Sequence, residues 1–178
     1  MSTEFERLAN ELRDLLRAAN EDIAECSRWL KSSGDSQFWR RVAYRTVFAS
    51  IEALVSHLKQ SAILFSFHDD EVFSPAEQLA MRDQDFEVDE KGRVVERNAK
   101  IRFLPNVCFA FRVFAVATAK DFQIVKDSGW DALTRAVKVR DRITHPKSAA
   151  AYTISDEEIK WMQDGWRWFG ETLVAVSS

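Results

Sequence analysis

Cysteine, proline and glycine are scarce in this chain of 178 residues, which contains two, three and five of them. So few turn-forming residues favour long helices over a fold of many short strands. The two cysteines, Cys26 and Cys108, lack the close spacing of metal ligands. Both fall on apolar faces of predicted helices, so we expect reduced core residues of a cytoplasmic protein and no metal site.

Long apolar runs and a strong charge of one sign are also missing. The most apolar stretch, 103–119, is interrupted by Pro105, Asn106 and Arg112 and is too short and too polar to cross a bilayer. The first residues are polar, so we expect no signal peptide and no membrane partner. The formal net charge is only −3, so any nucleic-acid binding must come from a local patch. Because no glycine-rich phosphate loop, nucleophile elbow or zinc spacing occurs, we expect no cofactor.

Helical periodicity dominates what is present. Apolar residues recur at three- and four-residue steps in the segments near 3–31, 36–67, 104–119, 128–145 and 156–178. Two capping boxes mark helix starts, Ser74 with Glu77 and Ser155 with Glu158. We therefore predict an all-α fold, an up-and-down bundle of about five main helices that forms a single domain over residues 1–178.

One segment differs from this pattern, at about 69–102. It is charged, and its short helix begins at Ser74-Pro75. Two triplets that each contain two apolar residues, 86–88 and 93–95, then flank Asp89-Glu90-Lys91-Gly92, which predicts a small β-hairpin. We interpret the segment as an insertion between core helices.

The candidate functional site lies at the end of the fourth long helix. Leu133 and Ala136 lie on one apolar face, and the next position on that face is Arg140. A charge in line with a core stripe is costly unless it is paired or reaches a cleft. His145 follows, at the helix end that Pro146 imposes. Asp141 precedes His145 by four residues, a spacing from which it can reach the imidazole.

Basic residues are concentrated in this segment. Between 135 and 147 five of them accompany one acid: Arg135, Lys138, Arg140, Arg142 and Lys147, against Asp141. Such an excess can attract a phosphate backbone, so Arg142, Lys147 and Lys138 are candidate substrate-binding residues. The alternative is a solvated helix end whose cations offset the helix dipole.

The sequence Arg140-Asp141-Arg142-Ile143-Thr144-His145 resembles the motif of the HEPN superfamily: arginine, a polar residue, three further residues and histidine. The surroundings are similar too, because the motif ends the penultimate long helix and a capped, tryptophan-rich helix closes the chain. The chain looks most like stand-alone bacterial HEPN proteins with an inserted hairpin. Several toxin members carry a tyrosine two residues after the histidine, where this chain has Lys147.

The resemblance implies a function. Family members are helical bundles that dimerise so that two motifs face each other in a cleft. Many are metal-independent endoribonucleases of toxin–antitoxin or phage-defence systems, whereas others only bind nucleic acid, nucleotides or protein partners. Arg140 would then stabilise the scissile phosphate, His145 would act as general acid or base, and Asp141 would occupy the polar position. The implied partners are a second copy of the chain, RNA, and an antitoxin or nucleotidyltransferase.

The residue chemistry agrees with this reading, since histidine titrates near neutrality and arginine can grip two phosphate oxygens. Five residues along a helix turn about 140°, so the two side chains of one copy converge poorly and we expect activity to need a dimer.

Two further predictions concern supporting residues. Glu52 and Arg45 lie seven residues apart on the second helix, in a line that also includes Arg41, Ser56 and Lys59. Such a line is more typical of a solvated face, although Glu52 can pair with Arg140 if the helices pack together. Trp161 or Trp168 is a candidate for a subunit interface. A third reading remains open, in which Arg140 and His145 merely finish a helix of an interaction protein.

Overall fold

The computed structural model of the chain describes residues 2–32, 36–66 and 72–178. Its elements are α1 (Ser2–Ser32), α2 (Gln37–Phe65), α3 (Pro75–Met81), β1 (Gln84–Val88), β2 (Val94–Asn98), α4 (Phe103–Ala117), α5 (Ser128–Thr144), the 3-10 helix η1 (Ala150–Tyr152) and α6 (Asp156–Ser177). The predicted fold class is confirmed: the described part of the chain is all-α, with five long helices, one short one and a two-stranded hairpin. No helix in that part is long and apolar enough to cross a membrane.

The chain divides into two compact units. The first unit comprises residues 1–54 and 125–176, and the second comprises residues 55–124. The boundary falls inside α2, which contributes its first half to one unit and its second half to the other. The organisation as a single domain stays a prediction.

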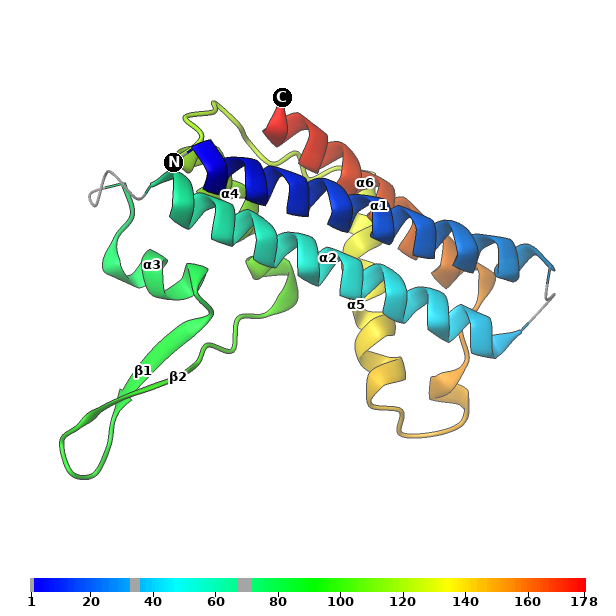
Figure 1. Ribbon diagram of the computed structural model, residues 1–178. Coiled ribbons are helices and arrows are strands. Elements are labelled where there is room, and N and C mark those ends of the chain that lie inside the picture. Colours follow the sequence, from blue (N-terminus) through cyan, green and yellow to red (C-terminus); the bar gives the residue numbers. More distant parts are fainter. Residues whose placement is uncertain (1, 33–35, 67–71) are drawn as a thin grey trace. The chain divides into compact units, whose positions relative to one another are not determined.

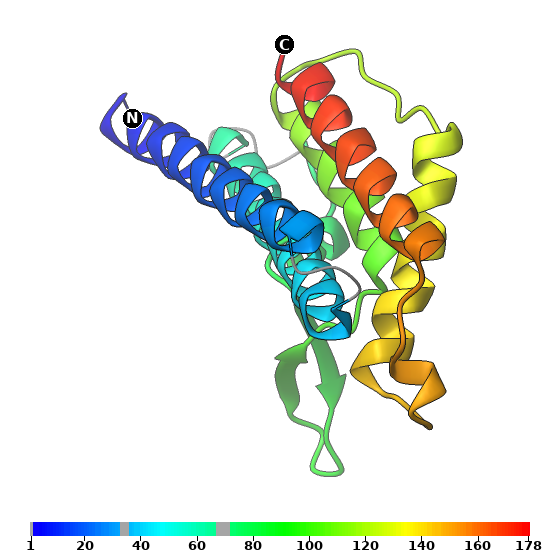
Figure 2. The same cartoon turned by 90° about the vertical axis from the view of Figure 1, so that its right-hand side faces the viewer.

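The first unit is built from α1, the first half of α2, α5 and α6. α1 and α2 run antiparallel side by side (Figure 1), as the short connection between them predicts. α5 and α6 also lie side by side (Figure 2). They approach each other closely at Gly165, where a Cβ atom would lie 2.8 Å from the Cα of Leu133. Tyr44 is fully buried between these elements, and its hydroxyl donates to the carbonyl of Glu158 at 2.6 Å. Burial raises the pKa of this phenol, so Tyr44 stays a neutral donor.

The helix starts in this unit follow the sequence signals. Asp127 caps α5 by accepting the backbone N–H of Gly129 at 2.8 Å. At the start of α6, Ser155 and Glu158 form the predicted capping box. These caps fix where α5 and α6 begin, and therefore which of their residues face each other.

The second unit contains the rest of α2, α3, the hairpin and α4. Its core includes Ala62, Phe73, Met81 and Val113. Lys59 of α2 is only 1% exposed, and its ammonium donates to Asp83 and to the amide oxygen of Asn106. The interpretation of the 41–59 line as a solvated face is therefore wrong at Lys59. Periodicity could not show that a carboxylate from the turn after α3 reaches this position.

The hairpin of the predicted insertion is confirmed. Each strand is two residues longer than the predicted triplet, and β2 begins one residue later than predicted. β1 and β2 pair antiparallel in a register that sets Phe86 opposite Glu96 and Val88 opposite Val94. Asp89 closes the loop, because its carboxylate accepts the backbone N–H groups of Lys91 and Arg93. Gly92 has a φ of +73°, a conformation that glycine adopts without strain.

The predicted capping box of α3 has a measurable consequence at low pH. Glu77 accepts from the backbone N–H of Ser74 and pairs with Arg112 of α4. These contacts, the Arg112 hydrogen bond first, lower the pKa of Glu77 from 4.5 to about 2.

A carboxyl whose pKa is lowered by folding stabilises the fold above its unfolded pKa, and this stability is lost as the pH falls towards the folded pKa. We expect the melting temperature of the wild type to fall between about pH 4.5 and pH 2 by more than that of Glu77→Gln. Thermal unfolding at pH 7, 4.5 and 2.5 measures this difference. Equal slopes for the two proteins would contradict it.

Candidate functional site

Arg140 points from α5 towards α2. Its guanidinium pairs with the carboxylate of Glu52, and its Cζ atom lies 5.6 Å from the centre of the Phe48 ring. The pairing expected for packed helices is therefore present. The Arg140 side chain remains 30% exposed. The arginine that interrupts the apolar stripe of α5 therefore lies at the edge of the interface with α2 and not in the core. A guanidinium held by a carboxylate and an aromatic ring has a fixed orientation.

The charge around Arg140 is balanced within the chain. Asp141 is a second carboxylate partner, 3.4 Å from the guanidinium, and its side chain is 62% exposed. A phosphate that binds Arg140 must compete with both carboxylates. Because these pairs are largely open to water, each is worth less than about 1 kcal/mol, and a dianion can displace them.

His145 is the C-terminal cap of α5. Its φ of −126° and ψ of 62° leave the helix, while its backbone N–H still donates to the carbonyl of Asp141 at 3.1 Å. The imidazole is exposed and has no hydrogen bond to the described part of the chain. Asp141 turns its carboxylate to Arg140, so the predicted contact between Asp141 and the imidazole is not found.

The remaining basic residues of the segment do not join Arg140. At about 100° per residue, Arg135, Lys138 and Arg142 share one side of α5, and Arg140 lies roughly opposite. Arg142 donates to Thr153 O at 2.9 Å and pairs with Glu158 at 2.7 Å, so it ties α5 to the start of α6. Lys138 is exposed on that side. Both contacts hold the Arg142 guanidinium against its own chain.

Lys147 is exposed just beyond α5, in the loop that leads to η1. This loop brings Tyr152 to α2, where Arg45 donates to the Tyr152 hydroxyl at 3.0 Å and Arg41 stacks over the ring at 4.2 Å. Arg45 was a predicted site residue, but sequence reasoning missed Tyr152. The contact joins residues more than a hundred positions apart, and no periodic signal marks it.

Together the contacts define one surface on α2. Arg41, Arg45, Phe48 and Glu52 lie within about 60° of one another around the helix. The first two contact Tyr152 and the last two contact Arg140. The structure thus brings together Arg140, Asp141, Glu52 and, farther along α2, Arg45.

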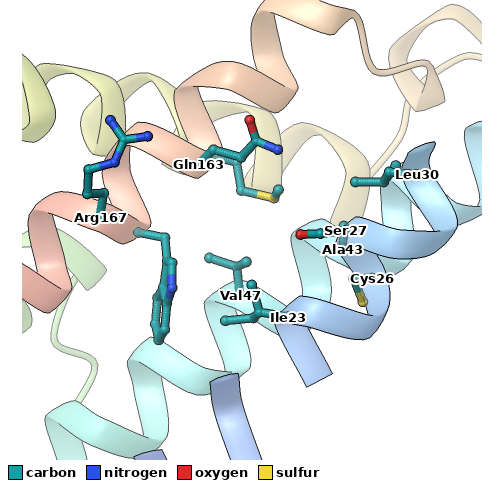
Figure 3. Close-up of a pocket in the computed structure, with 10 residues that line it drawn as sticks. Ile23, Cys26, Ser27, Leu30, Ala43, Val47, Gln163 and Arg167 are labelled. Carbon is teal, nitrogen blue, oxygen red and sulfur yellow. The ribbon is translucent and has the colours of Figure 1, made fainter. Parts of the chain in front are cut away.

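A separate pocket of about 410 Å³ lies between α1, α2 and α6 (Figure 3). Its lining is mostly apolar, with Gln163 and Arg167 at the α6 side, and it includes Ile23, Cys26, Ser27, Leu30, Ala43, Val47, Met162 and Trp166. Ala43 and Val47 are on the side of α2 opposite Arg45 and Glu52. The pocket is therefore distinct from the surface that carries Arg140.

The structure also shows where the two tryptophans predicted for a subunit interface lie. Trp168 is only 4% exposed and its indole N–H donates to Val125 O at 2.9 Å, so its proposed place at a subunit interface is wrong. Trp161 is half-buried, with Arg135 over its ring at 5.4 Å. No group of three or more His, Cys, Asp or Glu side chains in the described residues is arranged to hold a metal ion.

Comparison of the chain with protein-family models, with curated proteins and with solved structures finds no match in any of the three. The resemblance to the HEPN superfamily therefore stands on the Arg140–His145 motif and the order of the helices, and it stays a prediction.

Proposed function

We propose that the protein is a metal-independent endoribonuclease of HEPN type that uses Arg140 and His145. The observation that carries the proposal is the placement of Arg140. Its guanidinium is oriented by Glu52 and Phe48 and is 30% exposed, on the same helix whose last turn presents an exposed imidazole. This is the residue pair that the motif requires, held on a rigid element.

The chemistry needs two groups. Cleavage without a metal proceeds by attack of the RNA 2′-hydroxyl on the adjacent phosphorus, with loss of the 5′-oxygen of the next nucleotide. His145 would remove or deliver the proton, the role that histidine side chains most often serve in general acid–base catalysis. Arg140 would bind the phosphate oxygens as negative charge develops on them. Glu52 and Asp141 would orient the guanidinium until the phosphate replaces one of them.

The proposal includes a homodimer. Within one copy, Arg140 faces α2 of its own chain, while His145 leaves the helix about 140° farther round. Two copies related by a dyad supply an arginine and a histidine to the same cleft. We further propose a cytoplasmic setting in defence or toxin–antitoxin function, with an antitoxin or nucleotidyltransferase as partner.

The test is RNA cleavage in EDTA. We expect purified wild-type protein to cleave a mixed RNA pool, and Arg140→Ala and His145→Ala each to lower the rate by at least about 100-fold. Arg13→Ala is the matched control, because Arg13 is an exposed arginine of α1 whose side chain donates to Asn10 at 2.9 Å. Loss of activity in the control as well, or no cleavage by the wild type, would contradict the proposal.

A second candidate function follows from a specific observation. The His145 imidazole has no hydrogen-bond partner in the described residues, and Asp141 is turned to Arg140. A general base usually has such a partner to fix its orientation and tautomer. The alternative is a catalytically silent HEPN module that binds nucleic acid, a nucleotide or a protein. It predicts binding without turnover, weakened by Arg140→Ala and unchanged by His145→Ala.

A further inference from the structure

Two arginines of α2 surround a single tyrosine ring. Arg41 donates to the backbone carbonyl of Tyr152 at 3.2 Å, and its guanidinium carbon lies 4.2 Å from the ring centre. Arg45, one helical turn farther along, donates to the Tyr152 hydroxyl at 3.0 Å. We call these three residues the Arg–Tyr cluster. The ring fixes both guanidinium groups at the surface of the first unit.

The cluster carries positive charge that no carboxylate offsets. Among the described residues neither Arg41 nor Arg45 forms an ion pair, whereas their neighbour Arg40 pairs with Asp156. Glu52, the acid on the same side of α2, is engaged with Arg140. Two like charges four residues apart on a helix repel each other, so a bound anion would relieve a cost already present.

The cluster also has unused donors. A guanidinium carries five N–H groups, and Arg41 and Arg45 each donate one of them in this structure. Arg45 is exposed and Arg41 is half-buried. Paired guanidinium groups with free N–H donors match the oxygens of a phosphate, which arginine can bind in a bidentate way.

Holding the loop in place does not require the cluster. Gln37 already fixes the loop at Ile154, since its side chain donates to the Ile154 carbonyl at 3.0 Å and accepts the Ile154 N–H at 2.8 Å. Arg40 donates to the same carbonyl at 3.0 Å. Because Arg45 is exposed, its contact with Tyr152 adds little to the attachment of this loop. Attachment of the loop alone therefore does not explain why a charged residue stands at this position.

The cluster is aligned with Arg140. Arg45 and Glu52 lie on the same side of α2, seven residues apart, which corresponds to about 10 Å along the helix axis. Glu52 holds Arg140, so Arg45 and Arg140 face the same surface at about that separation.

We propose that the Arg–Tyr cluster is a second phosphate site, which binds the backbone of a single-stranded RNA at a phosphate about 10 Å from the one at Arg140. Arg41 and Arg45 contact the phosphate, and Tyr152 is a positioning residue that holds both guanidinium groups. This inference rests on the proposed function for the placement of RNA at Arg140. The inference adds the path of the RNA strand, which runs from Arg140 along α2 towards η1.

The test is binding of a fluorescent 12-nucleotide RNA with 2′-O-methyl groups, followed by anisotropy in EDTA. Methylation removes the attacking hydroxyl, so the probe stays intact whether or not the protein is a ribonuclease. We expect Arg41→Gln/Arg45→Gln to bind about tenfold more weakly at low salt, as charged hydrogen bonds are lost. The slope of log affinity against log salt should become shallower by about 0.7, the value for one phosphate contact on a single strand.

The matched control is Arg13→Gln/Lys31→Gln, which removes two positive charges from exposed positions on α1. It should leave the slope unchanged. Tyr152→Phe keeps both charges and removes only the hydroxyl that Arg45 contacts, so affinity should fall about threefold with the salt slope retained. Each variant should melt close to the wild type, since the Gln37 and Arg40 contacts to the loop remain.

The outcomes separate this site from the proposed activity. If the wild type cleaves RNA but the double variant binds as the control does, the second site is overturned and the ribonuclease stands. If nothing is cleaved but the double variant loses affinity and slope as expected, the second site stands and the ribonuclease fails. Competition by inorganic phosphate or AMP as effective as that of the oligonucleotide, at equal phosphate concentration, would overturn a strand-binding site.

Discussion

Mixing the Arg140→Ala and His145→Ala variants is expected to restore RNA cleavage to about a quarter of the wild-type rate, although each variant alone is inactive. Random exchange of subunits makes about half of the dimers mixed. In a mixed dimer, one of the two clefts receives the intact arginine of one copy and the intact histidine of the other. The opposite cleft lacks both.

The result discriminates between two geometries. If Arg140 and His145 of the same copy formed a site, every site in a mixed dimer would lack one residue and no activity would return. The divergence of the two side chains supports the shared cleft, because Arg140 contacts its own α2 while His145 caps the end of α5.

Cleavage by the mixture is measured in EDTA after an incubation that permits exchange of subunits. The control is a mixture of Arg140→Ala with the double variant Arg140→Ala/His145→Ala, which has no intact cleft in any dimer and should remain inactive. An inactive test mixture, with size-exclusion chromatography showing dimers, would contradict the shared cleft. A monomeric wild type that cleaves at full rate would contradict the dimer itself.

The sequence predicted what depends on neighbouring residues. Ser74 and Ser155 begin helices because each is followed by a glutamate three residues later, and both boxes form. The apolar stripe of α5 predicted that Arg140 would need a partner or a cleft, and the structure places it against Glu52 and Phe48. Local spacing is sufficient for the two capping boxes, because their interacting groups lie three residues apart at one helix start. The partner of Arg140 lies 88 positions away, and spacing alone could not identify it.

Contacts between distant segments could not be predicted in the same way. The five basic residues between 135 and 147 look like one patch in the sequence, but the helix turns Arg142 to Glu158 and Arg140 to Glu52. Lys59 can be buried because its ammonium donates to Asp83 and Asn106, which come from distant parts of the sequence. Tyr152 reaches Arg45 through a loop whose path no periodic pattern encodes.

Replacing Gly165 with alanine is expected to destabilise the protein by about 1–3 kcal/mol, the usual cost of inserting a methyl group into a close-packed interface. A Cβ atom at this position would lie 2.8 Å from the Cα and 3.0 Å from the N of Leu133. The obstacle is the backbone of α5, which cannot rotate away as a side chain does. The clash therefore outweighs the gain of about 0.5–1 kcal/mol that alanine normally brings within a helix.

Gly170 is the matched control on the same helix, because a Cβ atom there would meet nothing within 4 Å. Gly170→Ala should stabilise the protein by about 0.5–1 kcal/mol. Urea titrations followed by circular dichroism compare the two variants, and the midpoints should move in opposite directions from that of the wild type. If Gly165→Ala were as stable as Gly170→Ala, α5 and α6 would not approach this closely. Because α5 carries both Arg140 and His145, the same displacement should also reduce cleavage by Gly165→Ala under conditions in which it remains folded.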